Sequence, residues 1–152
     1  MMVTTNNPGA RRTQRGTTLI ETMVALLVLS VGLLGVAALQ MTSLRNNRGA
    51  HLRSQAQVMA YDIADRMRAN RDAALVGNYN IALGSPPGSP NPLAQIDLQR
   101  WRESVRTTLP AGDGSVAIQA GTNVVVITIR WADTTTGGTA APPENFTTRT
   151  QI

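Results

Sequence analysis

The longest uniform pattern in the sequence is an apolar segment near its N-terminus. No charged side chain occurs within residues 22–44, and residues 23–29 are hydrophobic without interruption. Because about 20 apolar residues in a helix cross a bilayer core of roughly 30 Å, the segment predicts a membrane-spanning helix. Arginines lie on both sides of it, so their number does not orient the span.

Beyond Arg45 the pattern becomes amphipathic and keeps the period of a helix. Apolar residues recur three and four positions apart, at Leu52, Ala56, Met59, Ile63 and Met67. Asp62 and Arg66 lie off this stripe at a spacing that predicts an ion pair on one helical face. No proline interrupts residues 17–85, and we therefore expect one helix that continues to about Asn70.

A second, shorter helix is predicted after a Pro/Gly/Ser-rich loop at residues 84–92. Asn91 can cap this helix, with Pro92 at its first position. Its apolar stripe consists of Leu98, Trp101, Val105 and Leu109. Pro110 ends it.

The remaining sequence alternates apolar and other residues with the period of strands. After a turn at residues 111–114, the alternating positions are Val116 and Ile118, then Val125, Ile127, Ile129 and Trp131, and finally Phe146, Thr148, Thr150 and Ile152. A hairpin at Gly121 and Thr122 joins the first two strands, and a Gly/Thr/Pro-rich loop at residues 133–143 precedes the third. The pattern predicts an α+β fold: a long N-terminal helix packed on a small antiparallel sheet, with a short second helix.

The formal charge of +5, from fourteen basic and nine acidic residues, suggests a nucleic-acid partner at first. Three of the basic residues, Arg11, Arg12 and Arg15, precede Gly16. If the chain is cut after Gly16, eleven basic residues face nine acidic ones, a balance of +2. We therefore do not expect nucleic acid as a partner. The absence of cysteine excludes a disulfide framework and a thiolate metal site.

Glu21 is the residue most in need of an explanation, because it is the only charge between Arg15 and Arg45. A carboxylate at the start of a membrane helix is costly unless it is paired. Cleavage after Gly16 would create an α-amino group on Thr17, four residues away, as a possible partner. In the alternative interpretation, Thr18 and Glu21 form a capping box that satisfies the first free N–H groups of the helix.

The order of these features resembles the class III signal of type IV prepilins and pseudopilins. Basic residues are followed by Gly16, two small polar residues, two aliphatic residues, Glu21 and a long uncharged run. The resemblance implies that prepilin peptidase cuts after Gly16 on the cytoplasmic side and methylates the new N-terminus at Thr17, where the family usually has Phe. It also implies that Glu21 pairs with the N-terminal amine of an adjacent subunit and aligns that subunit in the filament.

Further stretches are similar to minor pilins of the PilV type, at residues 26–40, 64–70, 109–112 and 126–133. The resemblance implies a leader at 1–16, a transmembrane and filament-core helix at 17–44, and a periplasmic pilin-like head at 45–152. The chain would cross the inner membrane once and reach the cell surface in the pilus. Its implied partners are prepilin peptidase, other minor pilins, the major pilin and the inner-membrane assembly platform. We expect no enzymatic activity and no cofactor.

Three alternatives remain open. A pseudopilin of a type II secretion system shares the processing motif and the helix-plus-sheet plan. A single-pass membrane protein with a ligand-binding periplasmic head could match the motif by chance. An ordinary secretory signal peptide could end near Ala38, although its apolar region would exceed the usual length.

Other candidate residues are assigned structural roles. His51, the sole histidine, has no acidic neighbour in helical register and is expected to be solvated or interfacial rather than a metal ligand or a catalyst. Trp101 and Trp131 are expected to be core anchors.

Arg66, Arg68 and Arg71 could form a basic patch, but cations near a helix end also complement its dipole. Gly32 and Gly35 could permit close helix approach or local melting, or could simply be tolerated membrane glycines.

Overall fold

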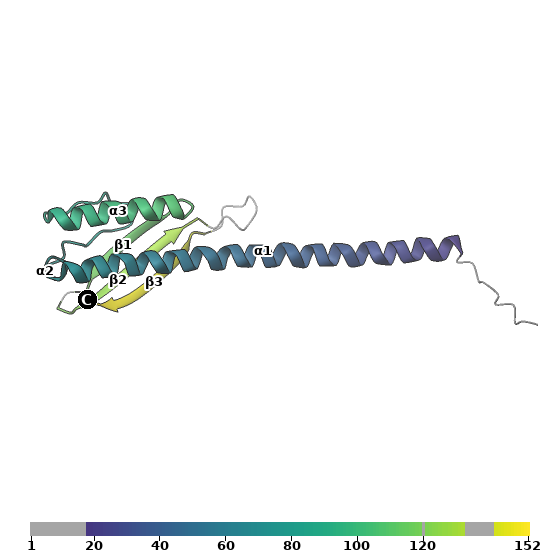
Figure 1. The fold of residues 1–152 in the computed structure, drawn as a ribbon, viewed down its shortest axis with the longest axis horizontal. Helices are drawn as coiled ribbons and strands as arrows, with labels where there is room; N and C mark the ends of the chain where they lie inside the picture. Colours follow the sequence, from purple (N-terminus) through teal and green to yellow (C-terminus); the bar gives the residue numbers. More distant parts are fainter. Residues whose placement is uncertain (1–17, 120, 133–141) are drawn as a thin grey trace, which may run out of the picture. The chain divides into compact units, whose positions relative to one another are not determined.

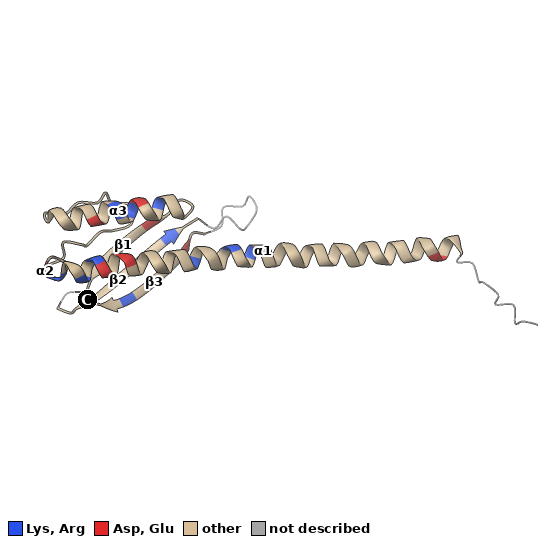
Figure 2. Cartoon of the chain, in the orientation of Figure 1, with Lys and Arg blue, Asp and Glu red and all other residues tan. Residues whose placement is uncertain are grey.

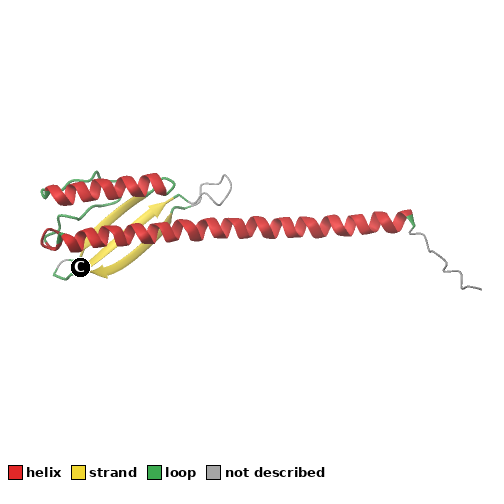
Figure 3. Ribbon diagram, in the orientation of Figure 1, coloured by secondary structure: helices red, strands yellow, loops and turns green. Residues whose placement is uncertain are grey.

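The computed structural model describes residues 18–119, 121–132 and 142–152. Its elements are α1 (Leu19–Ala69), α2 (Arg71–Leu75), α3 (Pro92–Thr108), β1 (Asp113–Ile118), β2 (Val124–Trp131) and β3 (Glu144–Gln151). Figures 1 and 3 show the long helix, the shorter α3 and the antiparallel strands. The predicted α+β fold is confirmed. The chain separates into two compact units, residues 1–42 and 43–152.

The described part of the first unit is the apolar beginning of α1. Its large hydrophobic side chains are exposed throughout, with Leu34 and Leu39 each at 72%. The helix is long and apolar enough to cross a membrane by length and composition. Figure 2 shows one acidic position near the start of this stretch and then no charge until the basic residues that begin at Arg45.

The second unit begins with the amphipathic part of α1, and the predicted stripe is confirmed. Its apolar residues, together with the small residues beside them, are buried: Leu52, Ala56, Met59, Ala60, Ile63, Ala64 and Met67. The alternation of large side chains with alanines lets neighbouring elements approach this face closely. The predicted ion pair also forms, with Arg66 Nε at 3.0 Å from Asp62 Oδ2.

The helix ends at Ala69, and a helix that the sequence pattern did not predict follows at once. Asn70 leaves the helical region, with φ −122° and ψ 51°, and α2 then forms from Arg71 to Leu75. Gly77 adopts a φ of 84°, which favours glycine. The segment after it buries Tyr79 and Ile81, which extend the core beyond the helices.

The second predicted helix is confirmed together with its cap. Asn91 is the N-cap of α3, and its side-chain Oδ1 accepts a hydrogen bond from the backbone N–H of Ala94 at 2.9 Å. Pro92 occupies the first position, where its missing N–H costs nothing. The inward face carries Ala94, Leu98, Trp101 and Val105, with the charged Asp97 and Arg102 buried beside them.

The three strands form an antiparallel meander in the order β1-β2-β3. Val125, Ile127, Ile129 and Trp131 alternate inward on β2, as predicted. An isolated bridge pairs Ile81 with Val116 on the outer edge of β1. In the described part of the β1–β2 hairpin, Gln119 N–H donates to Val124 O at 2.9 Å.

One boundary was predicted wrongly, because the turn assigned to residues 111–114 is shorter. Asp113 and Gly114 already belong to β1 and pair with Arg130 and Ile129. The Trp101 ring packs so closely against Gly114 that a Cβ there would clash with it. The glycine is therefore a packing requirement within the strand.

The inward face of the sheet, the amphipathic part of α1 and the apolar face of α3 form one core. Trp101 connects them, since it is fully buried and its Nε1–H donates to Met59 O on α1 at 2.9 Å. Both tryptophans lie in this core, with Trp131 only 2% exposed, as predicted.

Candidate functional site

The described part of the N-terminal motif begins with the cap of α1. Thr18 Oγ1 accepts a hydrogen bond from the backbone N–H of Glu21 at 3.3 Å, and Thr18 O accepts one from Thr22 N–H at 3.2 Å. The hydroxyl half of the predicted capping box is therefore present. Gly16 and Thr17, the residues of the predicted cleavage site, lie outside the described residues.

The Glu21 carboxylate itself is exposed in the first turn of α1. Within residues 18–119, 121–132 and 142–152, no basic side chain forms an ion pair with it. Thr18 Oγ1 accepts the Glu21 N–H, so this half of the cap does not require the Glu21 side chain. A carboxylate in the first turn complements the helix dipole and stays accessible to an external cation.

Two hydroxyl groups in the helix that follows Glu21 bond back to carbonyl oxygens of the same helix. Ser30 Oγ donates to Leu26 O at 2.7 Å, and Thr42 Oγ1 donates to Ala38 O at 3.0 Å. Such bonds let hydroxyl groups enter hydrocarbon without an unmet donor. Gly32 and Gly35 have no heavy atom within 4 Å of an added Cβ position, so no described contact in this chain requires glycine at either site.

The family model of the prokaryotic N-terminal methylation motif matches residues 11–37. The match begins at the basic residues before Gly16 and includes Glu21 and much of the apolar segment. This match supports a relation to type IV pilin-like proteins over the N-terminal segment that it covers. No curated protein and no solved structure matches the chain.

For a type IV pilin-like protein, the motif implies processing by prepilin peptidase and assembly into a pilus or a pseudopilus. The long apolar start of α1 is consistent with anchoring by a single membrane span. The chain thus joins a processing signal to a helix whose apolar surface no described part of the protein covers.

The other residues singled out from the sequence lie in the head. His51 is exposed, and the described residues contain no group of three or more acidic, histidine or cysteine side chains that could hold a metal. Arg66 is paired with Asp62 and Asp97, and Arg68 with Asp65, so two of the three arginines near the end of α1 are engaged in structural contacts.

Sequence reasoning missed a buried ion pair in the head. Arg102 is 1% exposed, and its Nε lies 2.7 Å from Asp113 Oδ1, while Asp113 Oδ2 accepts from Gly84 N–H at 2.7 Å. Burial alone raises the pKa of Asp113, but the hydrogen bonds from Arg102 and the backbone N–H groups of Gly84 and Gly114 outweigh it and hold the pKa below the ordinary value of an aspartate. The pair therefore connects α3, the start of β1 and the loop that precedes α3.

A second polar network was also missed. Tyr79 is fully buried and its hydroxyl donates to Asp97 Oδ2 at 2.7 Å, while Asn70 Nδ2 donates to the Tyr79 oxygen at 3.2 Å. Burial and the bond to Asp97 raise the pKa of Tyr79 to about 12. The signal was present in the sequence, because Asp97 and Arg102 adjoin Leu98 and Trp101 on the α3 face that the stripe predicts to be buried.

Proposed function

We propose that this protein is a minor pilin of the PilV type, which takes part in priming and assembly of a type IV pilus and has no enzymatic activity. The observation that carries the proposal is the methylation motif at residues 11–37, which runs directly into a helix with an uncovered apolar surface. In this proposal prepilin peptidase cuts after Gly16, the N-terminus at Thr17 is methylated, and the head lies in the periplasm.

Glu21 sets the alignment between subunits in this proposal. Its carboxylate is exposed and has no cationic partner among the described residues. The amine on Thr17 of a neighbouring subunit would lie at the start of an equally apolar helix. Because an unpaired charge is costly in apolar surroundings, the amine and the Glu21 carboxylate would stabilise each other. Packing between apolar helices supplies cohesion but allows sliding, whereas one ion pair per contact favours a single register.

The PilV assignment is supported by the resemblance in the head. Residues 64–70 end α1, and residues 126–133 include most of β2, whose Ile127, Ile129 and Trp131 are core residues. A pseudopilin of a type II secretion system is the second candidate, because it shares the processing motif. Cross-linked complexes of the full chain separate the two: pilus subunits as partners support the proposal, and secretion-channel components favour the alternative.

Processing is tested by mass spectrometry of the mature N-terminus. We expect a chain that begins with methylated Thr17. A chain with an intact N-terminus, or one that begins after Ala38, contradicts the proposal. Substitution of Gly16 by alanine or a larger residue should block cleavage, and the uncleaved chain should accumulate in the membrane.

The role of Glu21 is tested by three variants that separate charge from capping. Glu21→Gln keeps a side chain that can cap but removes the charge, and Thr18→Ala removes the hydroxyl that accepts the Glu21 N–H. We expect both Glu21→Gln and Glu21→Ala to be processed but to enter pili poorly, and Thr18→Ala to assemble nearly normally. If Glu21→Gln assembled like the wild type while Thr18→Ala failed, capping and not pairing would be the role of this turn.

A further inference from the structure

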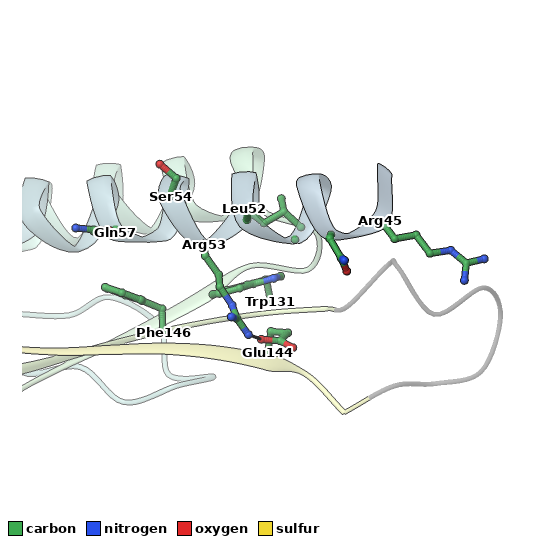
Figure 4. A pocket seen from close by; sticks show the side chains of 11 residues that line it. Arg45, Leu52, Arg53, Ser54, Gln57, Trp131, Glu144 and Phe146 are labelled. Carbon is green, nitrogen blue, oxygen red and sulfur yellow. Dashed lines mark hydrogen bonds and ion pairs between the residues drawn. The ribbon is translucent and has the colours of Figure 1, made fainter. Parts of the chain in front are cut away.

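A cleft of about 580 Å³ lies in the head between the first turns of α1 in this unit and the β2 and β3 strands. Figure 4 shows Trp131 and Phe146 beside the helix, and Arg45 at one end of the view. The residues that line the cleft are Arg45, Asn46, Gly49, Ala50, Leu52, Arg53, Ser54, Gln57, Trp131, Glu144 and Phe146.

The charges around this cleft leave one guanidinium available. Arg53 Nη2 lies 2.8 Å from Glu144 Oε2, and this contact joins α1 to β3 (Figure 4). The hydrogen bond and the charge of Glu144 raise the pKa of Arg53. Arg45 is exposed and pairs with no acidic side chain of the described residues. Two arginines and one glutamate give the lining a net charge of +1.

The cleft also has an apolar side. Trp131 and Leu52 are almost fully buried at 2% and 9%, and Phe146 is partly buried against the core. Asn46, Ser54 and Gln57 add uncharged hydrogen-bonding groups. A site with a cation, several amide and hydroxyl groups and an aromatic floor suits a ligand that joins a phosphate to an apolar body, rather than a free inorganic anion.

The position of Arg45 along the chain points to the source of such a ligand. It follows residues 22–44, which carry no charge, and is the first charged residue after them. Lipid phosphates lie just outside the hydrocarbon core that such a segment spans, and arginine matches a phosphate with paired N–H donors.

We propose that this cleft binds the headgroup of an anionic phospholipid, with Arg45 on the phosphate and Trp131 and Phe146 beside the glycerol region. The inference rests on the proposed membrane anchoring of the chain. The headgroup would hold the base of the head at the membrane surface while the subunit waits for assembly, and the subunit would release it on leaving the bilayer.

Native mass spectrometry of the full mature chain, purified in a mild detergent, tests the proposal. The probe lipids are phosphatidylglycerol and phosphatidylethanolamine, supplied in equal amounts. We expect one retained phosphatidylglycerol per chain, with retention reduced at least tenfold in Arg45→Gln, about the effect of one charge-assisted contact. Arg48→Gln is the matched control, because Arg48 is also exposed near the span but does not line the cleft.

A second variant predicts a gain rather than a loss. Glu144→Gln frees Arg53 from its ion pair and gives the cleft a second available guanidinium, so retention should rise. Equal loss in Arg45→Gln and Arg48→Gln would reveal general attraction between charges and overturn the site. Equal retention of the two lipids would overturn the preference for an anionic headgroup, and with it the proposal.

Flotation of the same variants with phosphatidylglycerol vesicles tests the proposed membrane anchoring independently of lipid binding in the cleft. Arg45→Gln should float with the vesicles like the wild type, since the apolar part of α1 is unchanged. A wild-type chain that fails to float would refute the anchoring itself. A chain that floats but retains no lipid in detergent would refute only the cleft.

Discussion

The two parts of α1 are both rich in apolar residues but differ in how those residues are distributed. In the first part, apolar side chains occur on every side of the helix, and Leu34 and Leu39 are each 72% exposed. In the second part they are confined to a stripe, and Ile63 and Met67 on this stripe are fully buried. The comparison shows that distribution around the helix decides the partner: an all-round apolar surface requires lipid or other helices, whereas a stripe requires one domain face.

The difference extends to polar groups. Ser30 and Thr42 in the first part bond back to carbonyl oxygens of their own helix. In the second part, Arg66 bonds to Asp97 on α3, and Arg68 bonds to Thr150 on β3. Hydroxyl groups in the first part thus bond within their own helix, whereas Arg66 and Arg68 in the second part also bond to other elements of the head. We therefore expect substitutions in the first part to impair membrane integration, and substitutions in the second part to destabilise the folded head.

The largest change in free energy is expected from Trp101→Ala, which disrupts the packing of the head but leaves the first part of α1 unchanged. The change leaves a cavity between α1, α3 and Gly114 and removes the indole N–H that donates to Met59 O. We expect a loss of about 3–5 kcal/mol in the free energy of unfolding of the head, measured by urea denaturation of the full chain in detergent micelles.

Val58→Ala is the control for this change, because Val58 lies on the same helix but is 65% exposed. Its unfolding midpoint should match that of the wild type. Flotation with vesicles should persist in both variants. If Trp101→Ala abolished flotation as well, the two parts would not depend on separate partners.

Leu33→Arg reverses the test by altering only the first part. Leu33 is 61% exposed, so in water an arginine there would cost little. In a bilayer a charged residue at mid-span costs about 2.5–3.5 kcal/mol. We expect a marked fall in the fraction of chain that resists carbonate extraction from membranes, with the near-ultraviolet circular dichroism of the head unchanged.

The matched control is Leu93→Arg, at a head residue that is 54% exposed. It introduces the same charge at a similar exposure, and we expect normal membrane integration. Comparable integration of Leu33→Arg and the wild type would show that the first part of α1 does not lie in lipid.

The buried ion pair predicts how the head responds to acid. The folded pKa of Asp113 lies below its ordinary value, so the pair adds stability above pH 4 that is lost as the pH falls through the folded pKa. Asp113→Asn should remove this part of the acid dependence. At pH 7 it should also cost about 1–3 kcal/mol, since the buried Arg102 loses its carboxylate.

Urea midpoints measured from pH 2 to pH 7 check this expectation. Asp65→Asn serves as control, because its side chain is 72% exposed in the ion pair with Arg68 and such pairs contribute little. An unchanged acid response in Asp113→Asn would assign the effect to other carboxylates.

The sequence predicted the elements of the head because its periodic residues act locally. Asn91 and Pro92 start α3, and the alternation along β2 assigns its buried face, both as predicted. The start of β1 was misplaced because Gly114 looks like a turn residue in sequence. Only the packing of Trp101 against it reveals the reason for the glycine.

The polar contacts were harder to predict, since they join residues that are distant along the chain. Arg102 meets Asp113 across the turn after α3, and Tyr79 reaches Asp97 from an irregular segment. No periodic pattern specifies such partners. The candidate site, in contrast, was predicted from residues that are close together in the sequence, namely Gly16, Thr17 and Glu21. The described structure adds the Thr18 cap and the exposure of the Glu21 carboxylate.

The smallest effect on stability is expected when the N-cap side chains of α3 and α1 are removed one at a time. Asn91→Ala removes the bond to Ala94 N–H and should lower the free energy of unfolding of the head by about 1 kcal/mol. Asn91→Asp keeps an acceptor and should lose much less. Thr18→Ala removes the corresponding cap of α1 but lies in the other unit, so the urea midpoint of the head should not move. A shift with Thr18→Ala as large as with Asn91→Ala would mean that the start of α1 and the head unfold as one cooperative unit. In that case the two parts of the helix would differ in the residues that they expose but would not unfold independently.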